Sequence, residues 1–146
     1  MMIRRLKSAL VWLVGGAVAF NAGLQLIPGE AFMTVRNIYV ADAWYGQTPV
    51  MQVSRTIRKA FWAEWSVELE ERTELGQYIF VAKAAGSNSY TPESKLPKAF
   101  TLDWWTFPTQ LRPARGVYRI ETCWEIRTQG FPVKEVCKHS NDFRIK

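Results

Sequence analysis

An uncharged apolar segment at residues 8–27, SALVWLVGGAVAFNAGLQLI, constrains this chain more than any other feature. At about 1.5 Å rise per residue, a helix of this length covers a bilayer core of roughly 30 Å, so the segment predicts one membrane-spanning helix. Arg4, Arg5 and Lys7 precede it. Because an excess of positive charge normally stays in the cytoplasm, we expect residues 29–146 to lie on the opposite side of the membrane.

Two other interpretations of this segment remain open. Residues 17–19 read Ala-Val-Ala and fit the small-x-small rule of signal peptidase, so cleavage there would release a secreted or virion protein. A helix buried in a soluble core is the third interpretation. If the segment is an anchor, Gly15, Ala19 and Gly23 recur at four-residue spacing, a pattern with which membrane helices pack closely.

Composition indicates one exported domain after the anchor, which gives a division into residues 1–28 and 29–146. The second part is long enough for a single hydrophobic core. The formal net charge of the chain is +6, and basic residues before the apolar segment contribute part of it. The remaining excess is spread without a run, so we expect a mildly basic surface and no nucleic-acid binding.

Beyond residue 32 the apolar pattern alternates with period two, which predicts strands. The expected strands are at residues 33–41, 50–55, 60–71, 78–83, 99–102, 117–127 and 132–138, with residues 143–146 finishing the sheet. The clearest is the third, which collects apolar residues on one face. The fourth is apolar on both faces and is expected inside a sheet, followed by a surface loop over residues 84–98. In the first, Val35 and Tyr39 compete with Ile38 and Val40 for the inward face.

The last third of the chain predicts a hairpin. If its turn centres on Gly130, Cys123 faces Cys137 and Trp124 faces Val136, so the register and the apolar pattern agree. Directly opposed cysteines lie within disulfide range, and a disulfide favours an oxidising compartment. Two free thiols, or a metal site with a nearby histidine, are the alternatives.

Residues for catalysis are scarce. His139 is the single histidine, and it stands between Lys138 and Ser140 in a polar setting that favours a solvated loop. The chain has no Gly-Lys-Ser/Thr phosphate loop, no Gly-x-Ser-x-Gly and no His-Glu-x-x-His. We therefore expect no enzyme, no cofactor and no metal site.

The tryptophan pair Trp104-Trp105 is the main candidate for binding. Neighbouring residues on a strand point to opposite faces, so one ring must face outward, either to bind a ligand or to cap the open end of the core. An outward ring would form an aromatic platform with other loop residues. The candidate binding residues are Trp104, Trp105, Trp44, Tyr45 and Tyr90, with Arg112 and Arg115 for anionic groups.

About seven short strands, frequent turns and no helix after the anchor predict an all-β fold, an immunoglobulin-like antiparallel β-sandwich. The Gly116-x-Tyr118 sequence resembles the tyrosine corner of such folds. The expected disulfide joins two neighbours of a hairpin, whereas the antibody bridge joins two sheets. We therefore expect an Ig-like topology outside the antibody family.

Several motifs stand in the carboxyl-terminal part: Leu96-Pro97, TLDWWT at residues 101–106, Tyr118-x-Ile120-x-Thr122-Cys123-Trp124 and Cys137-x-x-Ser140-Asn141-x-Phe143. From about residue 56 onward, the chain resembles small membrane-anchored proteins encoded by bacteriophages and prophages. This resemblance implies a bacterial or viral setting, in which the far side of the membrane is the periplasm. It implies no established activity.

The expected function is therefore binding or assembly. The chain would cross the inner membrane once, with its amino terminus in the cytoplasm and its domain in the periplasm, and contact a protein partner or a second copy through loops and exposed aromatics. A carbohydrate-binding module for peptidoglycan or a surface glycan is one alternative. A phage lysis accessory or a virion structural component is another.

Overall fold

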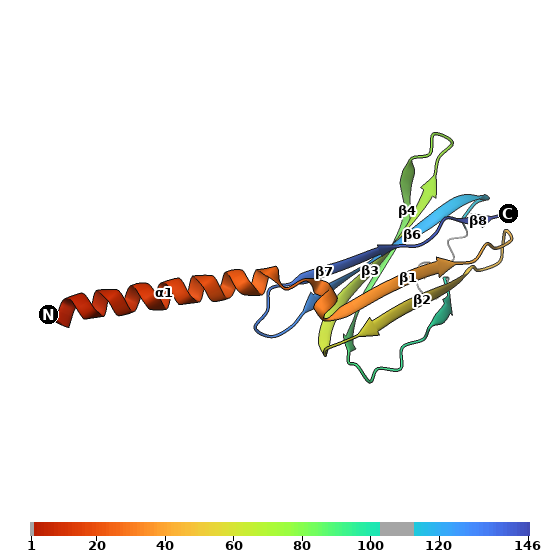
Figure 1. Ribbon diagram of the computed structural model, residues 1–146. Helices are drawn as coiled ribbons and strands as arrows, with labels where there is room; N and C mark the ends of the chain where they lie inside the picture. Colours follow the sequence, from red (N-terminus) through yellow and green to blue (C-terminus); the bar gives the residue numbers. More distant parts are fainter. Residues whose placement is uncertain (1, 103–112) are drawn as a thin grey trace.

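The computed structural model describes residues 2–102 and 113–146, and the side chains of this part from residue 12 onward. It consists of a long helix and a domain of strands (Figure 1). The elements are α1 (Met2–Leu26), the 3-10 turn η1 (Gly29–Ala31), β1 (Met33–Val40), β2 (Val50–Ile57), β3 (Phe61–Arg72), β4 (Tyr78–Tyr90), β5 (Ala99–Thr101), β6 (Gly116–Arg127), β7 (Lys134–His139) and β8 (Phe143–Ile145).

The strands form two antiparallel sheets that pack as a β-sandwich, which confirms the predicted all-β domain (Figure 1). One sheet has the order β1-β2-β5, and the other has the order β4-β3-β6-β7. Strand β8 pairs with the beginning of β6, beyond the end of β7. The described part of the chain thus forms eight strands, where the sequence predicts about seven and a finishing segment.

The core lies between the sheets, and strand β6 contributes the most to it. Alternate residues of β6 are buried, as the period-two pattern predicts. Trp124 and Tyr118 are the largest of the fully buried side chains. Burying a large apolar side chain contributes about 1.5–3 kcal/mol, so these two rings are major stabilising elements of the sandwich. On β3, Val67 and Leu69 face the same core, as expected.

The β6–β7 hairpin has the register that its turn predicts. Cys123 pairs with Cys137 and Trp124 with Val136, and Gly130 has a φ of 79°. The two cysteines form a disulfide with a Cα–Cα distance of 4.1 Å. The predicted pairing of thiols is therefore confirmed.

Strand β4 differs from its prediction in two ways. It continues to Tyr90, through residues expected to form a loop, and it lies at the edge of its sheet instead of inside. Its whole length pairs with β3. Small and polar residues such as Gly86 and Ser87 are poor strand formers by themselves, but a long partner strand outweighs such local preferences. Gly86 is needed here because the ring of Trp65 lies where its Cβ would be.

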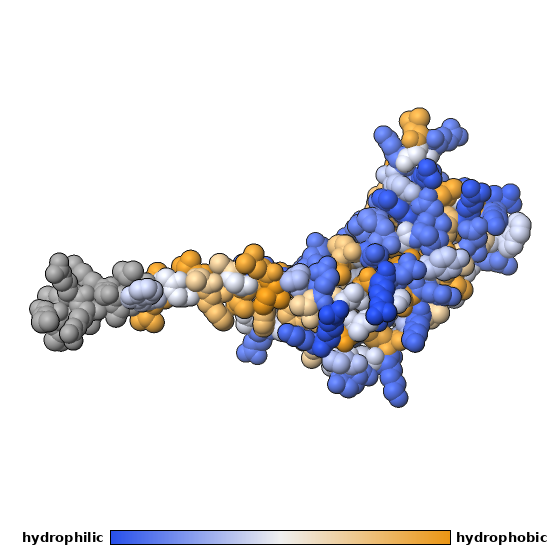
Figure 2. Space-filling model, viewed as in Figure 1, coloured by the Kyte–Doolittle hydropathy of each residue, from blue (hydrophilic) through white to orange (hydrophobic). Residues whose placement is uncertain are grey.

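Helix α1 begins earlier than the predicted segment and ends at Leu26, before Pro28. It projects from one end of the sandwich, and its described surface is largely apolar (Figures 1 and 2). By length and hydropathy, no helix within the described residues qualifies as a membrane span. Gly15 and Gly23 have no neighbouring atoms where a Cβ would stand, and Ala19 is exposed, so a packing role for this seam stays a prediction.

Candidate functional site

Several connections meet at the end of the sandwich opposite α1, which we call the distal end (Figure 1). The β1–β2 loop lies there, since Val40 pairs with Met51. The carboxyl terminus lies there too, because β8 runs along the beginning of β6. Residues 113–115, which lead into β6, belong to the same end. The distal end is therefore built from segments far apart in sequence.

Two exposed aromatic side chains stand next to each other in the β1–β2 loop, at a turn formed by residues 44–47, the aromatic turn. Trp44 is 65% exposed and Tyr45 is 56% exposed. The main-chain N–H of Gln47 donates to the carbonyl of Trp44 at 2.8 Å. Gly46 has a φ of 85°, a conformation that side chains with a Cβ rarely adopt. The turn is thus internally fixed while both rings face solvent.

The base of the aromatic turn is held by the carboxyl-terminal residues. Ala43 donates its N–H to the carbonyl of Arg144 at 3.0 Å, and Lys146 donates its N–H to the carbonyl of Ala43 at 2.9 Å. Tyr45 then donates its own N–H to the carbonyl of Lys146 at 2.7 Å. This short parallel pairing joins the loop of one sheet to the last strand of the other. The rings are therefore presented from a rigid main chain.

Asp42 reinforces this connection. Its carboxylate accepts the main-chain N–H of Arg144 at 2.8 Å and lies 3.0 Å from Nζ of Lys146. The hydrogen bond from Arg144, followed by that from Lys146, lowers the pKa of Asp42 below its ordinary value, since both favour the charged form. The carboxylate is therefore ionised at neutral pH, and it fixes the chain directly before the aromatic turn.

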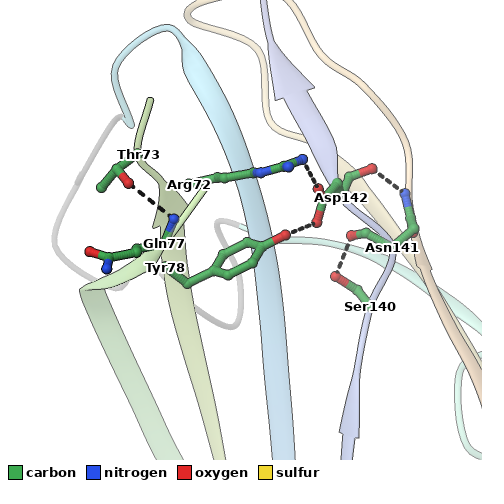
Figure 3. Close-up of polar contacts among 7 residues, drawn as sticks. All are labelled: Arg72, Thr73, Gln77, Tyr78, Ser140, Asn141 and Asp142. Carbon is green, nitrogen blue, oxygen red and sulfur yellow. Dashed lines mark hydrogen bonds and ion pairs between the residues drawn. The ribbon is translucent and has the colours of Figure 1, made fainter. Parts of the chain in front are cut away.

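A polar cluster beside this region connects the segment between β7 and β8 with the β3–β4 hairpin (Figure 3). The carboxylate of Asp142 accepts a hydrogen bond from the hydroxyl of Tyr78 at 2.6 Å and forms an ion pair with Arg72 at 3.2 Å. The hydrogen bond to Asp142 raises the pKa of Tyr78, because it stabilises the protonated phenol. Arg119 lies over the Tyr78 ring, 3.5 Å from its centroid. The cluster ties the turn end of the β3–β4 hairpin to the carboxyl-terminal segment.

The predicted binding residues have different outcomes. Trp44 and Tyr45 are exposed and adjacent, as the platform requires, and Arg115 is exposed near the start of β6. Tyr90 is wrong as a binding residue, because it is only 3% exposed. It occupies the last inward position of β4 and stacks on Phe61 with ring centroids 5.0 Å apart. The remaining three candidates, Trp104, Trp105 and Arg112, lie outside the described residues.

A second exposed apolar group, which the sequence pattern did not predict, lies on the β3–β4 hairpin. Leu75 is exposed at its turn, and Ile79 and Phe80 are exposed at the start of β4. Apolar residues on both faces of a strand suggested burial, yet the hairpin extends beyond the facing sheet (Figure 1). The sequence signal for this exposure was Leu75, an apolar residue within a short polar turn.

The histidine, the two cysteines and a serine beside them have partners in the described part of the chain. Nε2 of His139 lies 3.3 Å from a carboxylate oxygen of Glu121. Glu121 also lies near Cys123 and Cys137, but these sulfurs form the disulfide and are not free thiolates for a metal. The hydroxyl of Ser140 donates to the carbonyl of Asn141 at 2.7 Å.

No protein-family model, curated protein or solved structure matches this chain. The resemblance to proteins of bacteriophages and prophages therefore stays a prediction. The features that bear on function are the rigid exposed rings of the distal end and the apolar helix at the other end.

Proposed function

We propose that this chain is a membrane-anchored, non-enzymatic binding protein that presents an Ig-like domain to a protein partner. One observation carries the proposal: an apolar helix and a rigid aromatic turn stand at opposite ends of one sandwich (Figure 1). In this arrangement α1 holds the chain in the inner membrane, and the aromatic turn of residues 44–47 faces away from it. A bacteriophage or prophage origin, with the domain in the periplasm, is part of the proposal.

The exposed surface of α1 supports the anchoring. Trp12, Leu13 and Val14 are consecutive and all more than half exposed, so they point in directions about 100° apart around the helix. Val18, Phe20 and Leu26 are also exposed. Apart from Asn21 and Gln25, the described surface of α1 is apolar or small on every side. Such a surface is typical of a membrane span or of a deep core, whereas a helix that packs on one partner needs one apolar stripe. A bilayer covers every side of such a helix.

The order of the strands supports an Ig-like topology. The sheets β1-β2-β5 and β4-β3-β6-β7 correspond to the strand orders A-B-E and C′-C-F-G of Ig-like sandwiches. The hydroxyl of Tyr118 donates to the carbonyl of Ala114, four residues upstream, at 2.9 Å. Such a bond, from a tyrosine near the start of strand F to a carbonyl a few residues upstream, is typical of a tyrosine corner and supports the Ig-like topology.

The aromatic turn supports a protein partner. Tryptophan and tyrosine dominate the energetic centres of protein interfaces, and a rigid main chain loses little entropy on binding. The Asp42–Lys146 ion pair stands at the base of the turn and provides a polar rim. A small apolar centre with such a rim is the usual organisation of a protein–protein interface.

The test is co-purification of the full chain from detergent-solubilised membranes. We expect a stoichiometric partner or a second copy, and a Trp44→Ala, Tyr45→Ala variant should lower the affinity at least tenfold, the loss expected when about 1.4 kcal/mol or more is removed. Trp62→Ala is the matched control, because Trp62 is an exposed ring on another face. An unpartnered monomer, or equal binding by both variants, would contradict the proposal. Retention on purified cell wall, lost with Trp44, would instead identify a glycan-binding module.

A further inference from the structure

The end of the sandwich that joins α1 carries three cations. Arg58 and Lys59 lie between β2 and β3, and Lys134 begins β7. Arg58 donates its main-chain N–H to the carbonyl of Phe32, just after the helix, at 2.8 Å. Nζ of Lys59 lies 5.7 Å from the centroid of the Phe32 ring. Among the described side chains, those of residues 12–102 and 113–146, none of the three cations forms an ion pair.

The loop between β6 and β7 stands beside these cations. Residues 128–133 reach back along the last turns of α1 (Figure 1). Phe131 packs edge-on against Phe32 with ring centroids 5.5 Å apart, while Val133 is half exposed. Nζ of Lys134 donates to the carbonyl of Gln25 at 2.8 Å. A lysine at this place satisfies a carbonyl at the helix end and is favoured by the helix dipole.

These contacts fix the sandwich close to the end of the apolar helix. If α1 spans a bilayer, its last turn lies at the level of the headgroups, and the three cations and the loop lie at the same level. Glu30 is the acidic residue of the segment that joins helix and sandwich, and the main chain of Glu135 on β7 lies against Gly29. The three cations outnumber these two carboxylates. Cations near an anionic bilayer surface are each worth about 1 kcal/mol, or roughly a fivefold change in an equilibrium constant.

We propose that Arg58, Lys59, Lys134 and the loop of residues 128–133, together the proximal collar, bind anionic phospholipid headgroups of the leaflet from which α1 emerges. This inference rests on the proposed membrane anchoring. The cations contact lipid phosphates, and Val133 contacts the apolar side of the headgroup region. The collar thereby holds the sandwich upright, with the aromatic turn directed away from the membrane.

The test is hydrogen exchange of the full chain in nanodiscs of phosphatidylcholine alone and of phosphatidylcholine mixed with phosphatidylglycerol. Amides of residues 128–133 should exchange at least roughly fivefold more slowly in the anionic nanodiscs. Arg58→Glu with Lys59→Glu should abolish this difference. Arg115→Glu with Lys138→Glu, an equal change of charge away from the helix, near the start of β6 and near the end of β7, should preserve it.

The outcomes separate the collar from the anchor. Exchange that is equal in both lipids, from protein that co-elutes with nanodiscs, overturns the collar and leaves the anchor intact. If both charge variants lose the slower exchange in anionic nanodiscs equally, the collar is also overturned. The protection then depends on the net charge of the protein and not on the position of its cations. Protein that enters neither nanodisc overturns the anchor and the collar together, whereas partner capture by the aromatic turn is measured separately in detergent.

Discussion

The side-chain amide of Asn141 forms two hydrogen bonds with the main chain of Val40. The N–H of Val40 donates to Oδ1 of Asn141 at 2.8 Å, and Nδ2 of Asn141 donates to the carbonyl of Val40 at 3.0 Å. An amide side chain thus takes the place of a strand neighbour at the end of β1. Since Asn141 follows β7 and Val40 belongs to the other sheet, this pair joins the two sheets at the distal end.

Asn141→Ala should therefore destabilise the domain. Val40 is buried, and the substitution leaves its N–H and its carbonyl without these partners. A buried polar group that loses its partner costs about 1–3 kcal/mol, so we expect a loss of about 2–4 kcal/mol in the free energy of unfolding, measured with urea. Asn88→Ala is the control, because the side chain of Asn88 bonds only its exposed neighbour Ser89 among described residues. A similar loss in both variants would contradict the role of Asn141.

Removing the disulfide should also lower stability. Cys123 and Cys137 are 14 residues apart, and closing a loop of this size contributes about 3 kcal/mol by restricting the unfolded chain. The variant in which both cysteines are alanine should lose about 2–4 kcal/mol in urea unfolding. A reductant should lower the stability of the wild type toward that of the variant and leave the variant unchanged. A reductant effect on the variant would show that another process is measured.

The register of the hairpin was predictable because one turn and one alternating pattern determine it. With Gly130 at the turn, the opposition of Cys123 to Cys137 and of Trp124 to Val136 follows from counting. In strand β3 the same alternation distinguished inward from outward residues. Trp44 and Tyr45 were predictable as exposed because they occur among turn residues.

Contacts between distant segments were not predictable. The inward face of β1 was ambiguous because the strand has an irregularity between Val35 and Asn37, which shifts its alternation. Ile38 and Val40 face the core beyond this point. The burial of Tyr90 depends on the length of β3, which extends the pairing of β4. No local pattern shows where a partner strand ends.

Gly86→Ala should destabilise the domain through one contact. A Cβ at this position would overlap the ring of Trp65, which lies across β4. Inserting a methyl group into a packed site costs about 1–3 kcal/mol, and we expect a loss of this size in urea unfolding. Ser87→Ala, the exposed neighbour on the same strand, should change stability by less than about 0.5 kcal/mol. A neutral Gly86→Ala would mean that the ring moves aside without cost.

The aromatic turn should loosen when Asp42 is neutralised by acid. Its pKa lies below the ordinary value of 3.8 because Arg144 and Lys146 donate hydrogen bonds to the carboxylate. A carboxylate with a lower pKa in the folded state stabilises that state above the unfolded pKa, and this contribution disappears as the pH falls through the folded pKa.

The stability of the wild type should therefore approach that of Asp42→Asn on acidification. Unfolding of both proteins by urea between about pH 1 and pH 7 checks this convergence. In NMR spectra at neutral pH, the amide of Tyr45 should shift in Asp42→Asn, because its acceptor is Lys146. The amide of Gly130, at the opposite end, should stay unchanged. A constant stability difference at every pH would show that Asp42 acts by its shape and not by its charge.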